Sequence, residues 1–324
     1  MNAAPELLAA IVLVPDRLAT IRALLAALAS QTAARRLEIV FAGPSAVHTE
    51  ITAELMAPFA GWRFVPQDPF TTTCAARAAA IRATTAPWVV LTEDHSLPRH
   101  EWAQQLISRL ETGCDVVGPA VENGNPRHLG SWLNLLIEYG DWLAPHPGGP
   151  LPHLPGHNSA YRRDLLLALG SSLAQQLEAE SVLHWQFLRE GRSLWLEPRA
   201  ITRHQNFERL LPSLRLRLVG GRLFAANRSA AWSWPLRIAW ALAFPLIALR
   251  RTARVAANAR RVRPTAWLGL VPALFAFLLV DALGEALGYL AGAGRSMDYI
   301  SDIDFKRHRY FYRRGPADVG APAA

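Results

Sequence analysis

Hydrophobic residues follow two alternating patterns over the first two thirds of the chain. Short, nearly continuous apolar runs predict buried strands, and stretches in which apolar residues recur every three or four positions predict helices. The expected strands are residues 8–14, 37–41, 62–65, 88–92, 115–121 and 193–197, and the expected helices are residues 21–28, 71–85, 101–110 and 178–190. Strands separated by helices of this length predict an α/β fold, with a mostly parallel sheet and helices on both faces.

The most informative polar run, Glu93-Asp94-His95, directly follows the expected strand at residues 88–92. Ligands of α/β sheets bind beyond the carboxyl ends of the strands. Two adjacent carboxylates and an imidazole at that point indicate a divalent cation site, and oxygen ligands suit Mg²⁺ or Mn²⁺. The alternative is a structural role, in which Asp94 or Ser96 caps the helix that follows.

Five segments of the chain, taken in their order along the sequence, point to a protein family. They provide an opening strand and loop, a Glu-Ile-Val strand, an alanine-rich helix with an arginine, the acidic strand end and a Gly-x-Asn segment. These are residues 11–15, 38–40, 74–81, 88–94 and 156–163. In this order the chain resembles the inverting, GT-A-fold (Rossmann-like) glycosyltransferases of family 2, over roughly residues 8–229. Its Glu-Asp-His run also resembles a bacterial, membrane-associated subgroup that has E-D-H in place of D-x-D.

The resemblance implies a nucleotide-sugar as donor substrate and a divalent metal, Mg²⁺ or Mn²⁺. Asp94 aligns with the second aspartate of the family's D-x-D, and Thr92 replaces the first. Asp94 and His95 are therefore the expected metal ligands. The residues expected to bind the donor are Pro15, Asp16, Arg77, Glu93 and His204.

The acceptor side of the resemblance lies in the second half of the same region. Glu180 stands eleven residues before Gly191, where the family places its catalytic base, although the family's usual residue is aspartate. The alternatives are that Glu180 is a solvated helix residue, or that the neighbouring Glu178 is the base. The residues expected to contact the acceptor are Gly156, His157 and Asn158.

Two departures from the family pattern affect the function. The nucleotide-reading Asp-Asp-Gly-Ser segment is replaced by residues 42–45, Ala-Gly-Pro-Ser, which lack both acids. The Q-x-x-R-W signature of processive synthases is not evident, which favours single sugar additions. The alternative function is a non-catalytic GT-A-like scaffold in a polysaccharide assembly complex. His146, His153 and His157 have a loose zinc-like spacing, but a loop rich in proline and glycine does not favour a zinc site.

The basic charge is confined to one end of the chain. The formal net charge is +8; residues 1–229 hold 21 basic and 20 acidic residues, whereas residues 230–324 hold 13 and 6. Because the predicted catalytic region is nearly neutral, the charge does not favour nucleic-acid binding. The two cysteines lack paired spacing, which is typical of a reducing compartment.

The C-terminal region joins this charge to apolar segments. Two apolar runs, residues 238–249 and 266–280, flank an arginine-rich linker at 250–263, and a basic-aromatic tail follows at 306–314. Both runs are shorter than the ~20 residues that a spanning helix needs. They are core helices of a helical subdomain or, as we expect, a hairpin that rests on an anionic membrane surface.

The resulting domain prediction has two parts. Residues 1–229 form a GT-A glycosyltransferase domain, and residues 230–324 form a membrane-associating helical hairpin with a basic linker and tail. We expect a location on the cytoplasmic face of the cell membrane. The expected partners are a nucleotide-sugar donor, a lipid-linked or glycan acceptor and the membrane surface, in cell-envelope polysaccharide or glycolipid synthesis.

Overall fold

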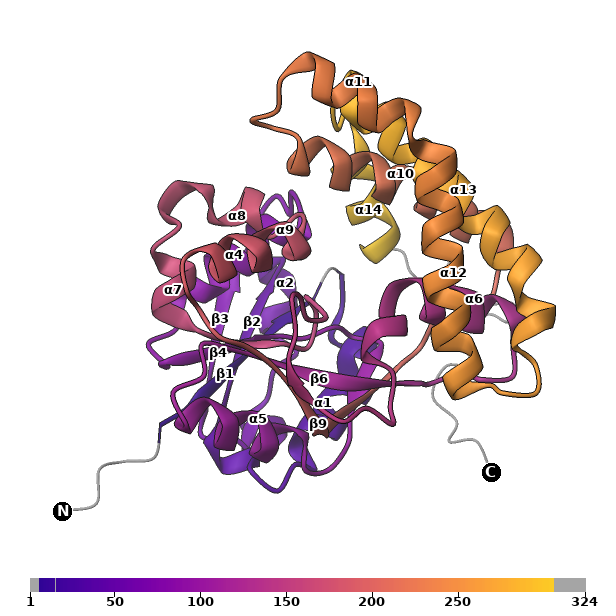
Figure 1. Cartoon of the computed structure of the whole chain (residues 1–324). Helices are drawn as coiled ribbons and strands as arrows, with labels where there is room; N and C mark the ends of the chain where they lie inside the picture. Colours follow the sequence, from indigo (N-terminus) through magenta and orange to yellow (C-terminus); the bar gives the residue numbers. More distant parts are fainter. Residues whose placement is uncertain (1–5, 15, 306–324) are drawn as a thin grey trace. The chain divides into compact units, whose positions relative to one another are not determined.

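The computed structural model describes residues 6–14 and 16–305. It divides into two compact units (Figure 1). Unit 1 comprises the residues up to Glu122 together with Ala144–His204, and unit 2 comprises Asn123–Leu143 together with the residues from Gln205 onward. By packing, the helical unit thus begins before the predicted boundary at 229/230 and includes one segment from the middle of the chain. The functional division at that boundary stays a prediction.

Unit 1 is built on a nine-stranded sheet. The order is β3-β2-β1-β4-β8-β6-β9-β5, and β7 pairs with β9. Its strands are β1 (Leu8–Leu13), β2 (Leu37–Gly43), β3 (Gly61–Pro66), β4 (Trp88–Leu91), β5 (Ser96–Pro98), β6 (Val116–Asn123), β7 (Gly149–Pro150), β8 (Ala160–Arg162) and β9 (Leu194–His204). The pairs β3-β2, β2-β1 and β1-β4 are parallel, whereas β4-β8, β8-β6, β9-β5 and β7-β9 are antiparallel. The α/β class is confirmed, but the sheet is mixed, where a mostly parallel one was predicted.

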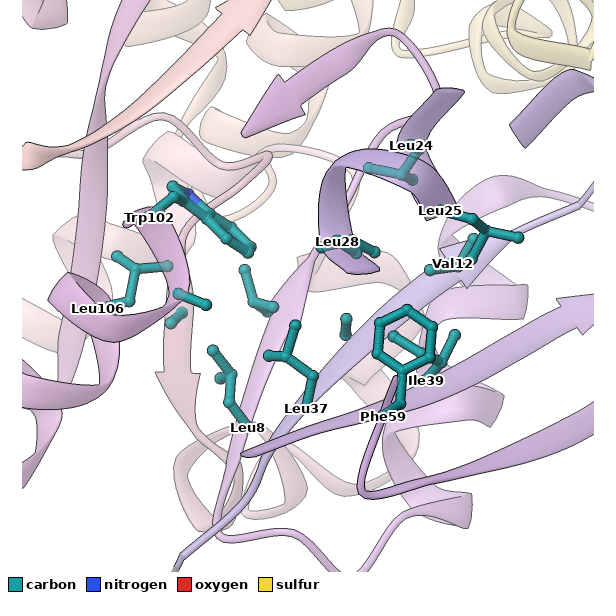
Figure 2. Close-up of a cluster of buried hydrophobic side chains, with 14 of the residues drawn as sticks. Leu8, Val12, Leu24, Leu25, Leu28, Leu37, Ile39, Phe59, Trp102 and Leu106 are labelled. Carbon is teal, nitrogen blue, oxygen red and sulfur yellow. The ribbon is translucent and has the colours of Figure 1, made fainter. Parts of the chain in front are cut away.

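Helices cover both faces of this sheet, as predicted. In unit 1 they are α1 (Arg22–Ala29), α2 (Ser45–His48), α3 (Ala53–Met56), α4 (Thr73–Ala83), α5 (Trp102–Glu111), α7 (Arg163–Leu167), α8 (Leu173–Gln176) and α9 (Glu180–Arg189), with 3-10 turns at Leu18–Ile21, Ala34–Arg36 and Gly170–Ser172. Leu8 and Val12 of β1 lie in one buried cluster with Leu28 of α1 and Trp102 of α5 (Figure 2). Successive strand residues point to opposite faces, so the buried Ile11 faces the other side, where α4 packs.

The register of the parallel strands brings their carboxyl ends to one edge. Ile11 pairs with Leu91, and the backbone N–H of Thr92 donates to the Ile11 carbonyl at 3.1 Å. Beyond β1, the N–H of Val14 donates to the Ala42 carbonyl at 2.9 Å. The residues that follow β1, β2 and β4 therefore share this edge, where ligands of such sheets bind.

Unit 2 is helical. Its elements are α6 (Leu129–Tyr139), a 3-10 turn (Gly140–Trp142), α10 (Leu210–Arg228), α11 (Trp234–Leu242), α12 (Phe244–Val262), α13 (Trp267–Ala291) and α14 (Ser296–Phe305). α13 packs against α10, α11 and α12. Its length and apolar composition would allow it to cross a membrane, a property that core helices of soluble proteins share. The predicted second apolar run is confirmed as a helix, which continues past Asp281 and Glu285 to Ala291.

The predicted basic linker at 250–263 is wrong, because nearly all of it is helical and forms the body of α12. Thr252, Val255, Ala256 and Ala259 are buried at helical spacing between the arginines, so the segment packs as one side of an amphipathic helix. The predicted basic-aromatic tail at 306–314 lies outside the described residues.

Candidate active site

Glu93 is the centre of a cluster of imidazoles at the carboxyl edge of the sheet. Its Oε2 lies 3.3 Å from His95 Nε2 and 3.4 Å from His204 Nε2. Its Oε1 lies 3.3 Å from His157 Nδ1. Glu93 and His95 come from the turn between β4 and β5, His204 ends β9, and His157 lies in the loop before β8. A predicted metal ligand, a predicted donor residue and a predicted acceptor residue therefore surround the Glu93 carboxylate, which was itself predicted to bind the donor.

Strand pairing explains why these side chains meet. Ser96 of β5 pairs with His204 of β9, which sets His95 beside His204 with their rings edge-to-face, 4.5 Å between centroids. Asn158 ties the next loop to the same place, since its N–H donates to the Leu91 carbonyl at 2.6 Å and its side-chain amide donates to Ser96 Oγ at 2.7 Å. Asn158 has a φ of 64°, a left-handed conformation that asparagine tolerates better than most residues.

Glu180, the expected base, is the first residue of α9 and faces this cluster. Its Oε1 lies 3.7 Å from Arg77 Nη1 and 3.7 Å from His157 Nδ1. Its side chain is only 16% exposed, so it is not the solvated helix residue that the sequence left as an alternative. Gly156 is required beneath it, because a Cβ there would lie 2.5 Å from Glu180 Cδ.

Arg77 lies beside both His157 and Glu180. The Arg77 guanidinium reaches from α4, is almost fully buried, and donates from Nη2 to His157 Nδ1 at 3.0 Å. The same imidazole nitrogen is the atom closest to both Glu93 and Glu180. The buried Arg77 cation thus lies within ion-pair distance of Glu180 while it donates to His157.

The geometry offers a second metal-ligand set beside the expected pair, Asp94 and His95, which stays a prediction. The group of described residues whose ligand atoms all lie within 4.8 Å of one another is Glu93, His95 and His204. Asp94, a predicted ligand, instead accepts a hydrogen bond from His95 Nδ1 at 2.8 Å, which turns Nε2 of that ring toward Glu93. Separations of 3.3 and 3.4 Å suit donor atoms that share one ion at bond lengths of about 2.1 Å.

Thr92, which stands where the family has the first aspartate of D-x-D, uses its side chain within the sheet. Its hydroxyl donates to the Ile11 carbonyl at 2.7 Å and the residue is 3% exposed. The side chain therefore secures the end of β4 to β1. Glu93, one position later, is the carboxylate that faces the histidines.

A buried support behind the Gly156 loop, formed by His184 and Tyr161, was not predicted from the sequence. The Leu154 N–H donates to His184 Nδ1 at 3.2 Å, so the proton of this imidazole is on Nε2, which lies 2.9 Å from the Tyr161 hydroxyl. That hydroxyl donates to the Gly156 carbonyl at 3.4 Å. Burial lowers the pKa of His184 to about 3 and raises that of Tyr161 well above its ordinary value, so both groups stay neutral.

The structure says least about Pro15 and Asp16, the two expected donor-binding residues that follow β1. Pro15 lies outside the described residues. Asp16 is exposed, and its carboxylate lies 3.9 Å from Arg17 Nε. Beside the segment that lacks the family's two acids stands Asp68, which accepts hydrogen bonds from the Ser45 hydroxyl and, at 3.1 Å, from the Ser45 N–H. Sequence reasoning missed Asp68 because it lies 23 residues further along the chain.

Comparisons with known proteins agree with this architecture. The family model described as glycosyl transferase family 2 matches residues 10–170. Among solved structures, the mannosyltransferase PcManGT from Pyrobaculum calidifontis, in complex with GDP-Man and Mn²⁺, is 16% identical with a TM-score of 0.51, over 91% of this chain and 89% of that chain. S. aureus TarS 1-349 is 12% identical with a TM-score of 0.45, over 88% and 90%. No curated protein gives a significant match.

Proposed function

We propose that this glycosyltransferase, whose residues 10–170 match the glycosyl transferase family 2 model, transfers one sugar at a time with inversion. The donor is a nucleotide-sugar and the acceptor supplies a hydroxyl group. The observation that carries this proposal is the placement of Glu180, a mostly buried carboxylate that faces Arg77 and His157 beside the Glu93 cluster.

In the proposed reaction, Glu180 is the general base. Its carboxylate takes the proton of the acceptor hydroxyl while that oxygen attacks the anomeric carbon from the face opposite the leaving group. The bond between the anomeric carbon and the diphosphate oxygen breaks, and the nucleoside diphosphate leaves with the bonding electron pair. His157 and Arg77 orient the base, and Gly156 leaves the space that its side chain occupies.

The residues around Glu93 fit a divalent metal. Glu93, His95 and His204 would hold it, and Asp94 would orient His95 through the Nδ1 hydrogen bond, as outer carboxylates do for metal-bound histidines. When bound, the metal neutralises charge on the leaving diphosphate. Of the two expected ions, Mn²⁺ is favoured over Mg²⁺ because two of the three donors are imidazole nitrogens.

Recognition of the nucleotide falls to other acids than those of the family pattern. Asp68, beside residues 42–45, and Asp16, after β1, are the two candidates, and both follow strands of the parallel half. Asp68 is the better candidate, because its carboxylate is already fixed by the Ser45 N–H and hydroxyl.

We further propose that the enzyme works on the cytoplasmic face of the cell membrane, with a lipid-linked or glycan acceptor, in cell-envelope polysaccharide or glycolipid synthesis. In this proposal residues 1–229 catalyse glycosyl transfer and residues 230–324 contact the membrane. The support is the apolar helix α13 and the net charge of +7 that residues 230–324 carry, from 13 basic and 6 acidic residues.

The direct test is a screen in which the purified full chain is offered nucleotide-sugars and released nucleoside diphosphate is measured. We expect Mn²⁺-dependent release from one sugar class and its loss in Glu180→Gln. The scaffold alternative is favoured by the absence of acids at residues 42–45 and by Thr92 facing the backbone. Calorimetry that finds no binding of UDP or GDP with Mn²⁺ present would support the scaffold.

A further inference from the structure

Exposed hydrophobic side chains gather in unit 2. In the described residues fifteen large hydrophobic side chains are exposed, and fourteen of them belong to unit 2; Leu188 is the exception. Those on the C-terminal helices are Trp234, Leu236, Ile238, Leu242, Leu246, Leu249, Leu268, Phe275, Leu283, Leu287 and Leu290. Isolated exposed leucines need no explanation, whereas a concentration on neighbouring helices marks an interaction surface.

On α13 the exposed side chains form a single stripe. Leu268, Phe275, Leu283, Leu287 and Leu290 follow one another at intervals of seven, eight, four and three residues, which keeps them on one helix face. The stripe extends over roughly 33 Å at 1.5 Å per residue. The opposite face is buried against the neighbouring helices of unit 2, so only the stripe is available to a partner.

The buried face of α13 packs so closely against α10 that α13 cannot turn another face toward it. A Cβ at Gly284 would lie 2.1 Å from the Leu218 carbonyl oxygen of α10. A Cβ at Gly288 would lie 2.3 Å from the Arg222 carbonyl oxygen. These glycines allow the backbones of α10 and α13 to touch, and they fix which side of α13 faces outward.

The charged residues of α10, α11 and α12 are all arginines, whereas Asp281 and Glu285 of α13 pair with Arg251. Residues 209–280 include twelve arginines and neither an acid nor a lysine. On α12 the exposed stripe begins with Leu246 and Leu249 and continues with Arg250, Arg254 and Arg260. A helix surface that passes from leucine to arginine suits the boundary between acyl chains and anionic headgroups.

The same arginines argue against a spanning arrangement. Arg251 of α12 lies 2.8 Å from Asp281, which is near the middle of α13, and Figure 1 shows the two helices side by side. If α13 crossed a bilayer, the exposed Arg250 and Arg254 would be carried to about its centre. Exposed arginine at that depth is strongly unfavourable.

We propose that unit 2 lies in the surface of an anionic lipid leaflet without crossing it, with the exposed side chains of α11, the first half of α12 and α13 inserted among the acyl chains. The exposed arginines of α12 contact the lipid phosphates. This deepens the membrane partner proposed above, and it does not depend on the proposed chemistry.

Flotation of the full chain with vesicles tests the surface. Vesicles of mixed phosphatidylcholine and phosphatidylglycerol should bind the chain, and pure phosphatidylcholine should bind it less. Leu283→Gln with Leu287→Gln should together weaken binding by about tenfold, since the two leucines are 43% and 41% exposed and only that part of each side chain can still be buried. Leu188→Gln, the matched exposed leucine in unit 1, should leave binding unchanged.

Charge is tested by Arg250→Gln with Arg254→Gln. We expect about a fivefold loss of binding per arginine on phosphatidylglycerol vesicles, with a weaker salt dependence. The proposal is overturned if the chain ignores both vesicle types, or if the leucine and arginine variants bind as the unaltered chain does. Binding only to nucleic acid would equally overturn it.

Cysteine labelling distinguishes a helix α13 that lies on one leaflet from one that spans the bilayer. This test does not require the leucine variants to fold. Cys74 and Cys114 are buried, so Thr265→Cys and Arg295→Cys, which flank α13, introduce the reactive thiols. With chain added to preformed vesicles, both positions should react with an impermeant maleimide from outside. Protection of one of them until detergent is added would show that α13 spans. Failure of vesicle binding while the chain still cleaves its nucleotide-sugar would reject this inference alone.

Discussion

Gly156 lies directly against the side chain of Glu180: a Cβ at residue 156 would be 2.5 Å from both Cγ and Cδ of the glutamate. We therefore expect Gly156→Ala to displace the proposed base without removing it. A shift of about 1 Å in a catalytic group costs on the order of 10²-fold in rate. The measurement is kcat for glycosyl transfer, with nucleotide affinity followed by calorimetry.

The matched control for this substitution is Gly61→Ala. Gly61 begins β3 and a Cβ there meets nothing within 4 Å, so kcat should not change. Equal rates for the Gly156→Ala variant and the unaltered chain would show that Glu180 does not act from the position the structure gives it.

Glu180→Gln should abolish most of the turnover by removing the proton acceptor while keeping the size of the side chain. A general base contributes typically ~10²–10⁴-fold, and a loss of that size in kcat is expected with nucleotide binding retained. Glu178→Gln, two residues earlier, is the control and the competing assignment. If Glu178→Gln were the inactive variant and Glu180→Gln the active one, the base would have to be reassigned.

Substitutions around Glu93 should separate direct metal ligands from the residue that orients them. His204→Ala should remove most Mn²⁺ binding, whereas Asp94→Asn should weaken it by about 10–100-fold through His95. Titration of free Mn²⁺ by electron paramagnetic resonance measures this without substrate. His48→Ala, an exposed histidine away from the cluster, is the control.

Two results would contradict that ligand set. Complete loss of Mn²⁺ binding in Asp94→Asn would return Asp94 to the ligands, as the sequence first predicted. Unchanged binding in His204→Ala would remove His204 from them.

The parallel half of the fold was predictable because its signals are local. The run from Leu8 to Leu13 is buried and β-rich, and it pairs in parallel with the strands that begin at Leu37 and Trp88. The helical character of residues 250–262 was missed because six arginines over 250–263 suggested a linker. What makes that segment helical is the small buried side chains between them, such as Thr252 and Ala259.

The candidate site was also predictable only in part. Sequence order brought Glu93, His157 and Glu180 into one prediction, and the structure brings their side chains to one place. The sequence order could not distinguish Asp94 from Glu93 as the carboxylate that lies near both His95 and His204. That choice depends on how the turn after Leu91 is held by Asn158, a contact between residues 67 positions apart.

Asp68 should determine nucleotide affinity if it replaces the missing acids after β2. We expect Asp68→Asn to weaken binding of the nucleoside diphosphate by about tenfold, the size of one charge-assisted hydrogen bond. The control is Asp16→Asn, the other candidate, measured by the same calorimetric titration. If only Asp16→Asn weakens binding, the loop after β1 reads the nucleotide.

The buried pair His184 and Tyr161 predicts a specific dependence of stability on pH. The pKa of His184 is about 3 in the folded chain, against an ordinary value near 6.5, because burial disfavours its charged form. The unfolded chain therefore binds a proton that the folded chain does not, and stability falls as the pH drops below about 6.5. Between pH 7 and pH 5 this one group should cost about 2 kcal/mol of unfolding free energy.

His184→Gln tests this prediction. The quantity to compare is the change in unfolding free energy between pH 7 and pH 5, and not the stability of the variant at either pH. Urea unfolding at pH 7 and pH 5 should show the loss in the unaltered chain reduced by about 2 kcal/mol in the variant. His48→Gln, at an exposed imidazole, is the matched control. An unchanged pH dependence in His184→Gln would mean that His184 is protonated in the folded chain. The hydrogen bond from Leu154 to Nδ1, and with it the support of the Gly156 loop, would then be wrong.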